Sequence, residues 1–440
     1  MRRSRFWQRF AIYMRPCDGR YEELKRGTIT YNVVDDLVAG CIVAAVTIPL
    51  AMGFAIASGM APEQGIIGGA VASLFGALFG GSKYFVHGSA AAFIPVIAGL
   101  MAMYDTGFLV LASIMAGLML LSAGFFRMGR FIERIPHSIL VGFTIGIAII
   151  IAFSQLGPAL GFREKSGPAI IDQLSFAWSN RSEINFSAVL MVMLTMVFCK
   201  AFEKLSGYIP GPVPALAFGY FGAQTFWSEK ELVLLSDQYG SFMHDLFALR
   251  APSIPAYWDL TVLIDLFYYA FAFFIIASFE SLSYGRAADR LGFNSGTQFN
   301  PDKELRGLGI INMFSSLLNG FPQSANLGRT ALNIRIKGRS PLTGIARAVF
   351  IVLIALLSAP YLQKVPVACI AGILLYVASG MIKKREVNKI IQMNNYHVVL
   401  MCYTVVAVPL AGFMTGVLSA LFLYVICSHF FESKKAPLQE

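Results

Sequence analysis

Two ionisable residues, Glu280 and Arg329, stand in strongly apolar parts of the chain, where an ionised side chain is costly. Glu280 should therefore be either protonated or paired. One interpretation makes it a proton carrier that changes its protonation state during a transport cycle. The other makes it a structural carboxylate bonded to backbone N–H groups or to Arg329. Arg329 could supply positive charge to an anion, form that salt bridge, or do both.

The segment that holds Arg329 begins at a break in the chain. The string NGFP at 319–322 ends an apolar helix expected at 305–319. The next expected helix, 324–334, is too short to span a bilayer, which takes about 20 apolar residues. A helix that starts at a break inside a membrane protein directs its free N–H groups and the positive end of its dipole into the interior. This arrangement suits an anion.

The same pattern occurs once earlier in the chain. An apolar helix expected at 64–80 meets a Gly-Gly break, and a short helix of small residues is expected at 88–102. The small residues that would offer backbone N–H groups to an oxyanion are Ser89, Ala90 and Ala91 in the first copy and Ser324, Ala325 and Asn326 in the second. Close helix packing by small residues is the other interpretation, and the two are compatible. The copies lie seven expected spans apart, so their orientations are opposite, and inverted repeats with broken helices are typical of secondary transporters.

Composition places these segments in a membrane. The chain is 56% hydrophobic and only 14% charged, whereas soluble domains average about 25% charged residues. We therefore expect an all-α polytopic membrane protein with 14 transmembrane segments. The expected spans are 37–58, 64–80, 88–102, 107–125, 136–157, 185–203, 212–227, 260–284, 305–319, 324–334, 342–361, 366–382, 396–408 and 410–428.

Basic residues predict the orientation of these spans. If both termini are cytoplasmic, 27 of the 35 Lys and Arg residues fall on the inner side and six in outer loops, as the positive-inside rule requires. Residues 1–36 would then be a basic cytoplasmic segment, with an amphipathic helix near residues 6–13, and residues 429–440 a short cytoplasmic tail. The net charge of +10 is explained by this asymmetry, so no nucleic-acid partner is expected.

Motifs for other chemistry do not stand out. No Walker, zinc-ligand, nucleophile-elbow or Gly-rich phosphate motif occurs, and the six cysteines lack metal-ligand spacing, so we expect no enzyme activity, no metal and no cofactor. His87 lies beside the first break, where it could titrate near neutral pH. The plainer expectation for His87 is a loop residue near the cytoplasmic side.

Several strings, taken in order along the chain, resemble the SulP family of anion transporters (sulfate permease-like). The strings are DLVAG at 36–40, IPLAMGFAIASG at 48–59, LFGGSK at 78–83, GSAAAF at 88–93, FESL at 279–282, ADR at 288–290, EL at 304–305 and GRTALNIR at 328–335. The resemblance implies seven-plus-seven inverted repeats, about 37–228 and 259–428, in a homodimer. Spans 1–4 and 8–11 would form a core domain, and spans 5–7 and 12–14 a gate domain.

The resemblance also implies where substrate binds. An anion would lie between the N-termini of the short broken helices, spans 3 and 10, beside a span-1 aromatic residue. Phe54 is that aromatic here, and Leu50 lies a turn away on the same face, where the family often has glutamine. The usual Ser-Gly-Pro-Thr before span 3 reads HGSA at 87–90. Because the pocket differs, the identity of the anion is not carried over.

Coupling is inferred in the same way. Sodium-coupled members resemble one another in having aspartate at the span-8 position and a hydroxyl residue a turn later, whereas this chain has Glu280 and Tyr284. The resemblance therefore favours H⁺ over Na⁺ as the coupling ion. The family's cytoplasmic STAS domain has no counterpart after the last expected span.

The sequence thus predicts a secondary active transporter of a small anion, which could be a dicarboxylate, sulfate or bicarbonate. It would be H⁺-coupled, work by alternating access and reside in the lipid bilayer of a bacterial inner membrane. An uncoupled anion channel or exchanger on the same scaffold is an alternative. A nucleobase/H⁺ symporter is another, although such proteins typically carry a second acidic residue on span 10, where this chain has Arg329.

Overall fold

The structure is a computed structural model. It describes residues 23, 25, 26 and 32–431, apart from 133–135, 164–166, 168, 206–209, 228–230, 241–247, 254–258 and 293–295. The amphipathic helix expected near residues 6–13 and most of the expected C-terminal tail lie outside the described residues.

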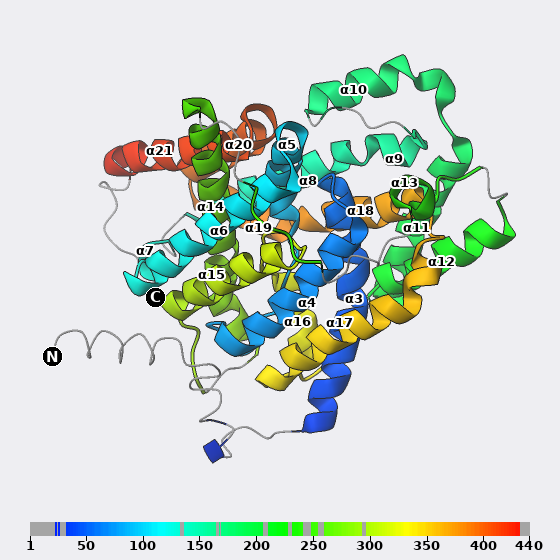
Figure 1. Ribbon diagram of the computed structural model, residues 1–440. Coiled ribbons are helices and arrows are strands. Elements are labelled where there is room, and N and C mark those ends of the chain that lie inside the picture. Colours follow the sequence, from blue (N-terminus) through cyan, green and yellow to red (C-terminus); the bar gives the residue numbers. More distant parts are fainter. Residues whose placement is uncertain are drawn as a thin grey trace.

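Each expected span coincides with a helix (Figure 1). These helices are α3 (Val33–Ala57), α4 (Pro62–Phe79), α5 (Ile94–Met103), α6 (Thr106–Phe125), α8 (His137–Ser154), α11 (Phe186–Leu205), α12 (Pro212–Thr225), α14 (Leu260–Leu291), α15 (Pro301–Leu317), α16 (Leu327–Arg335), α17 (Pro341–Leu362), α18 (Val367–Met381), α20 (Asn395–Ala411) and α21 (Phe413–Phe431). Shorter elements connect them: η1 (Ala91–Phe93), α7 (Gly129–Ile132), α9 (Leu156–Leu160), α10 (Ile170–Ser179), η2 (Arg181–Glu183), α13 (Leu235–Tyr239) and α19 (Lys384–Met393).

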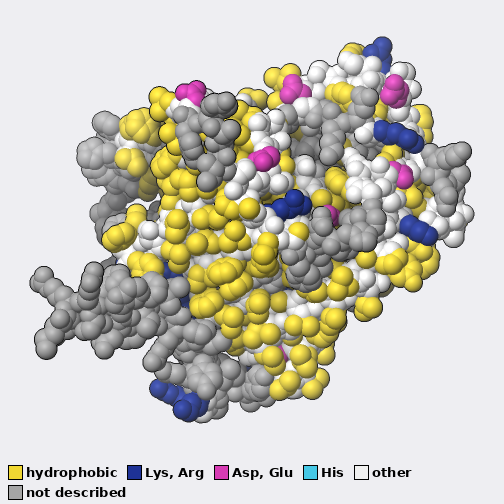
Figure 2. All heavy atoms as spheres, viewed as in Figure 1, with side chains coloured by type: hydrophobic (Ala, Val, Ile, Leu, Met, Phe, Trp, Pro, Cys, Tyr) yellow, Lys and Arg dark blue, Asp and Glu magenta, His cyan; other side chains and the backbone are white. Residues whose placement is uncertain are grey.

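The helices have the lengths and surfaces of membrane helices. Among the described residues, seven helices are long and apolar enough to cross a membrane, and three shorter helices are also apolar. Large apolar side chains such as Phe186, Leu357 and Phe422 are mostly exposed on the outer surface. In the view of Figure 2, hydrophobic side chains cover much of the middle of the molecule and few charged side chains interrupt them. An exposed apolar surface of this extent requires lipid around it, so the prediction of an all-α polytopic membrane protein is confirmed.

The two breaks meet as a short antiparallel ribbon. Strand β1 (His87–Gly88) pairs with β2 (Ser324–Ala325), with His87 opposite Ala325 and Gly88 opposite Ser324. The sequence analysis placed Gly88, Ser324 and Ala325 inside helices, and that was wrong. The helices begin later, at Ala91 and Leu327. Extended segments in the interior must satisfy their backbone groups without water, and pairing one break with the other does so.

The helices that carry the breaks also pack on one another. Helix α15 lies against α6 and α4, and α17 lies against α3 and α4. The first turn of α3 is tied to α17, because the Asp36 carboxylate accepts from the Arg339 N–H at 2.9 Å and the Thr343 hydroxyl at 2.6 Å. A second set of contacts joins α8 to α20 and α18, α11 to α18, and α20 to α21.

Candidate functional site

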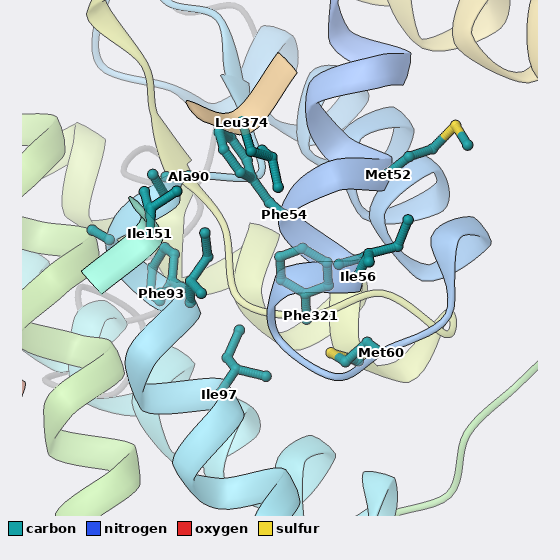
Figure 3. Close-up of a cluster of buried hydrophobic side chains, with 14 of the residues drawn as sticks. Met52, Phe54, Ile56, Met60, Ala90, Phe93, Ile97, Ile151, Phe321 and Leu374 are labelled. Carbon is teal, nitrogen blue, oxygen red and sulfur yellow. The ribbon is translucent and has the colours of Figure 1, made fainter. Parts of the chain in front are cut away.

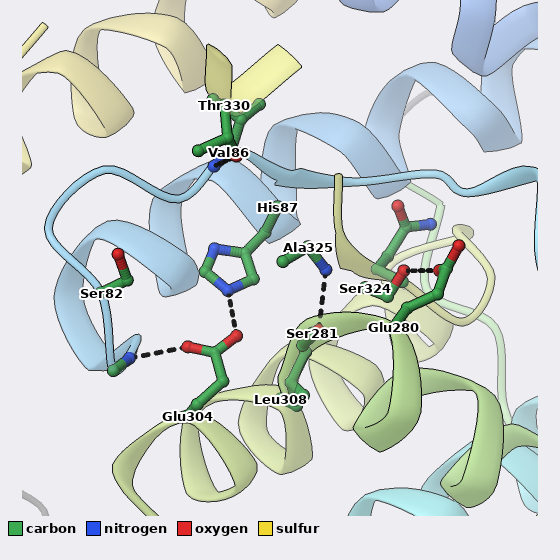
Figure 4. A network of polar contacts seen from close by, with 12 residues as sticks. Ser82, Val86, His87, Glu280, Ser281, Glu304, Leu308, Ser324, Ala325 and Thr330 are labelled. Atoms are coloured by element: carbon green, nitrogen blue, oxygen red, sulfur yellow. Dashed lines mark hydrogen bonds and ion pairs between the residues drawn. The ribbon is translucent and has the colours of Figure 1, made fainter. Parts of the chain in front are cut away.

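Hydrogen bonds around the ribbon join its two breaks to each other and to two helices, α16 and α14 (Figure 4). The Val86 N–H donates to the Thr330 hydroxyl of α16 at 3.1 Å, and the Ala325 N–H donates to the Ser281 hydroxyl of α14 at 2.9 Å. The Asn326 N–H donates to the Val86 carbonyl at 3.0 Å. The expectation that the N–H groups of Ala325 and Asn326 are free was therefore wrong. Buried donors of this kind are rarely left without a partner.

Donors for a ligand come instead from the first turns of the two helices. Asn326 is the N-cap of α16, and its side chain accepts from the Arg329 N–H at 3.0 Å. The N–H groups of Leu327 and Gly328 in the same turn have no intrahelical partner, as helix geometry dictates. In the other copy, η1 begins after Ala90 without a side-chain cap. Both helix starts therefore present backbone N–H groups near the ribbon.

Arg329 brings a cation to this point. Its side chain is 2% exposed, and its Nη2 donates to the Ser89 carbonyl at 2.5 Å, so it joins the two copies. Nε and Nη1 are buried and have no hydrogen-bond partner among the described residues. Nη1 lies against Gly88, where a Cβ atom would come within 2.7 Å of it. A buried guanidinium with unused donors is a site to which an oxyanion can bind through two hydrogen bonds.

Glu280 lies beside strand β2 of the ribbon. The side chain is 8% exposed, and Oε2 accepts from the Ser324 hydroxyl at 2.5 Å (Figure 4). Within the described part of the chain it forms no ion pair with Arg329, which bonds Ser89 instead. Of the alternatives left open by the sequence, the salt bridge is therefore absent from this conformation. Glu280 is a carboxyl group whose one described partner is a hydroxyl, which can both donate and accept, so the group can hold or release a proton without losing that partner.

The span-1 residues form an apolar wall. Phe54 is buried and packs in the same hydrophobic cluster as Ala90 and Phe93, whereas Leu50 is half-buried against it (Figure 3). At Gly53, α3 approaches α18 so closely that a Cβ atom would lie 2.8 Å from Cδ2 of Leu374. The aromatic side chain implied by the family resemblance thus does lie beside the start of the first short helix.

His87 lies in a strand, whereas the sequence suggested a loop residue near the cytoplasmic side. It is fully buried in β1, and its Nε2 lies 2.8 Å from Oε1 of Glu304, which is equally buried (Figure 4). Oε2 of Glu304 accepts from the Gly81 N–H at 2.7 Å. This bonded pair connects the first break to the N-terminal turn of α15. The pair could not be predicted from the sequence, because its two residues are 217 positions apart.

Three residues at the site were missed by the sequence analysis: Ser281, Thr330 and Gly88. Ser281 and Thr330 position β2 and β1 through their hydroxyls, and Gly88 makes room for Arg329. Ser281 and Thr330 directly follow Glu280 and Arg329 in the sequence, so adjacency to a buried charge was the available signal.

A cavity of about 670 Å³ lies at one end of the site. Helices α3, α5 and α14 line it on one side, and α8, α9, α18 and α20 on the other. Neither Ala90 nor Ser324 is among the described residues that line it. Ile56 and Ile94 line the cavity and also belong to the buried cluster that contains Phe54 and Phe93. Apolar side chains therefore close the cavity off from the ribbon.

Two broken helices that meet inside a bundle of apolar helices, with a buried arginine and a buried carboxyl group at their junction, define a membrane transporter. A profile of the sulfate permease family matches residues 33–404, and the chain belongs to that family. It is therefore an anion transporter and an integral membrane protein, and its relatives are transporters rather than enzymes.

Individual relatives match over most of the chain. YvdB of Bacillus subtilis (strain 168) is 32% identical over 389 residues, which are 88% of this chain and 72% of YvdB. The bicarbonate transporter BicA of Picosynechococcus is 26% identical and matches 88% of this chain and 70% of its own length. Among solved structures, the transmembrane domain of a cyanobacterial BicA superposes with a TM-score of 0.74 at 25% identity, over 89% of this chain and 98% of that domain. SLC26A9 shares the fold, with a TM-score of 0.81 at 14% identity over 98% of this chain and 70% of its own.

Proposed function

We propose that the protein carries a small oxyanion, bound between the start of η1 and the start of α16, in symport with a proton. The observation that carries this proposal is Arg329, a buried guanidinium whose Nε and Nη1 have no partner among the described residues. Sulfate, bicarbonate and dicarboxylates all present planar or tetrahedral oxygen pairs that match such donors. The names of the family and of BicA support an oxyanion substrate.

The energetics favour occupancy by an anion. A buried donor without a partner costs about 1–3 kcal/mol, and more if it is charged. An oxyanion at this point would accept from Arg329 and from the first N–H groups of two helices, whose positive dipole ends add to the attraction. Phe54 and Ala90 would exclude water from one side of the anion, which strengthens each of these interactions.

We propose further that the helices of the ribbon move as one body. Spans 1–4 and 8–11 (α3–α6 and α14–α17) would form a core, and spans 5–7 and 12–14 (α8, α11, α12, α18, α20 and α21) a gate. Core helices are tied together by polar contacts such as Asp36 with Thr343 and His87 with Glu304. Between the two bodies lie apolar contacts, such as the Phe143 and Phe279 rings with centroids 5.9 Å apart. Apolar contacts lack fixed hydrogen-bond geometry, so such an interface can slide during alternating access.

A proton would enter the cycle at Glu280. Protonation of the Glu280 carboxyl group would remove a negative charge beside the ribbon, so the core with bound anion would carry less charge as it moves. The contact between Glu280 and Ser324 supports this role, since Ser324 lies in the same strand that leads into α16. Sodium coupling is the alternative. We also propose that the protein lies in a bacterial inner membrane with both termini cytoplasmic, which the relative from Bacillus subtilis and the distribution of Lys and Arg support. A homodimer is proposed from the family resemblance alone.

Substrate binding is tested by uptake into proteoliposomes of labelled sulfate, bicarbonate, fumarate and uracil, with Arg329→Gln as the variant. We expect accumulation of one of the three anions. Arg329→Gln should reduce it by about 10-fold or more, because a hydrogen bond to a charged group contributes about 1.5–3 kcal/mol. Arg335→Gln is the matched control, since Arg335 is an exposed arginine on the same helix, and it should transport like wild type.

Two outcomes would contradict the proposal. If Arg329→Gln took up the anion as fast as wild type, Arg329 would not bind the substrate. If only uracil were taken up, the substrate would not be an anion. If no ion gradient drives accumulation of the anion above its equilibrium distribution, the uncoupled channel is favoured instead.

A further inference from the structure

Helix α19 (Lys384–Met393) is a strongly basic helix between two apolar ones. Helix α18 ends at Met381 and α20 begins at Asn395, so only a few residues separate α19 from apolar helices on either side. Four basic side chains are exposed here: Lys383, Lys384, Arg385 and Lys389. The acidic residue of α19, Glu386, bonds His137 of α8 at 2.9 Å and Lys389 at 3.1 Å. The helix therefore presents a net positive surface.

One face of α19 is fixed against the protein. Ile390 is fully buried in a cluster with Val141 of α8 and Met401 of α20, and Val387 packs on the same cluster. Residues three apart share a helix face, so Val387 and Ile390 define the packed side. Arg385 and Lys389 lie on the opposite side of the helix, whereas Lys384, three residues before Val387, lies at the border of the packed side and is exposed. The basic face thus points away from the protein.

Apolar side chains border the basic face. Ile382, Ile391 and Met393 are 46%, 56% and 59% exposed, respectively. A helix surrounded by water would not gain from exposing three such side chains within a dozen residues, whereas a helix in the interfacial plane of a bilayer buries them among acyl chains. Because apolar helices hold α19 at both ends, it cannot leave the level at which those helices emerge from the lipid.

We propose that α19 binds the headgroups of anionic phospholipids. The ammonium and guanidinium groups would contact the lipid phosphates, and Ile382, Ile391 and Met393 would enter the apolar layer beneath them. The contacts of α19 with α8 and α20 then fix those helices in the leaflet through the bound lipid. A soluble acidic partner would satisfy the charges but would leave the apolar side chains in water, which favours lipid as the occupant.

The test is lipid selection by the full chain. The purified protein is equilibrated with equal amounts of phosphatidylcholine and phosphatidylglycerol, and the retained lipids are counted by mass spectrometry. Each basic residue near an anionic surface contributes about fivefold to the partition, equivalent to about 1 kcal/mol. Wild type should therefore enrich phosphatidylglycerol by about fivefold or more, and the triple variant Lys384→Gln, Arg385→Gln, Lys389→Gln should lose most of that enrichment.

A matched triple variant controls for overall charge. Arg163→Gln, Arg181→Gln and Lys364→Gln remove the same charge from exposed positions outside α19 and should keep the enrichment. For wild type, the enrichment should also fall when NaCl is raised to about 1 M, where the Debye length is about 3 Å. This second measurement needs no variant and so does not depend on folding of the triple variant. Unchanged enrichment in the α19 variant, an equal loss in the control variant, or insensitivity to salt would each overturn the proposal.

Discussion

At the scale of single residues, Arg329 and Glu280 lie near the ribbon but do not form an ion pair with each other. Arg329 bonds the carbonyl of Ser89 beside β1, and Glu280 bonds the hydroxyl of Ser324 in β2. A direct ion pair would use the donors that an anion needs. Both residues could be found from the sequence, because ionisable residues are rare in apolar segments and usually functional. Their actual partners could not, since a contact between residues 89 and 329 leaves no local pattern.

Gly88 makes the position of Arg329 possible. In Gly88→Ala, the new Cβ would lie 2.7 Å from Nη1, so the guanidinium must move while the backbone stays in place. We expect KM for the transported anion to rise on the order of 10-fold, because small displacements of a positioning group are costly, with thermal stability close to wild type. Transport kinetics and a thermal melt check both statements.

Gly380→Ala is the control for that substitution. No atom lies within 4 Å of a Cβ at Gly380, so this variant should transport normally. Unchanged KM in Gly88→Ala would mean that Arg329 does not hold the anion in the position described.

At the scale of elements, the two breaks depend on helices distant in the sequence. Strand β1 is held by α16 through Thr330 and by α15 through His87 and Glu304, whereas β2 is held by α14 through Ser281. Each bond lies in a region where water cannot replace it. The ribbon is therefore a rigid part of the bundle and can keep two helix starts in a fixed relation.

Removing the carboxyl group of Glu304 should destabilise this arrangement. Glu304→Ala leaves His87 and the Gly81 N–H without their partner in a fully buried place, and the loss should be about 3–5 kcal/mol. Glu304→Gln keeps an acceptor for one of them and should lose less. Unfolding monitored in detergent, by heat or denaturant, measures the difference.

Glu386→Ala serves as the comparison for that series. Glu386 is a partly exposed carboxylate that also bonds a histidine, and exposed pairs contribute about 0–1 kcal/mol. Equal effects of Glu304→Ala and Glu386→Ala would show that the buried pair does not secure the ribbon.

The sequence predicted helices better than it predicted their junctions. Long apolar runs and the Gly and Pro breaks located most ends of the expected spans to within four residues, because hydropathy over about 20 residues is a strong signal. The exceptions are α5, which begins at Ile94 rather than at 88, and α14, which continues to Leu291 rather than ending at 284. The β1–β2 pairing was missed, since strands of two residues have no periodicity to detect. Helix α19 was also missed as an element, because its residues fall between the expected spans 366–382 and 396–408.

At the scale of the whole molecule, the cavity lies toward one end of several helices. Its lining residues include the last residues of α3 and α8 and the first part of α14 and α18, which is the predicted outer side, together with most of α5. Ile56 and Ile94 separate it from Phe54, Phe93 and the ribbon. If the anion binds at the ribbon as proposed, this cavity is a vestibule beside a site that is closed to it.

Shortening the side chains of Ile56 and Ile94 should make the proposed binding site accessible from the cavity. We expect that, in the double variant Ile56→Ala, Ile94→Ala, a cysteine placed at Ala90 reacts with a membrane-impermeant thiol reagent about 10-fold faster than in the wild-type background. The reason is that two side chains between the cavity and Ala90 have been shortened. Mass spectrometry of the Ala90→Cys peptide measures the rate without interference from native cysteines.

Leu356→Ala with Leu357→Ala, on the exposed surface of α17, is the control and should leave the rate unchanged. Equal rates in the double variant and the wild-type background would contradict a barrier made of Ile56 and Ile94.

The coupling of anion to proton is tested most directly by one comparison. Uptake of labelled sulfate, bicarbonate and fumarate is measured in proteoliposomes with an inward proton gradient, an inward sodium gradient or neither, for wild type and Glu280→Gln. The predicted result is that protons stimulate uptake of one anion by wild type and that Glu280→Gln loses the stimulation. Stimulation by sodium, or a proton response that survives in Glu280→Gln, would contradict the role of Glu280 as the proton carrier.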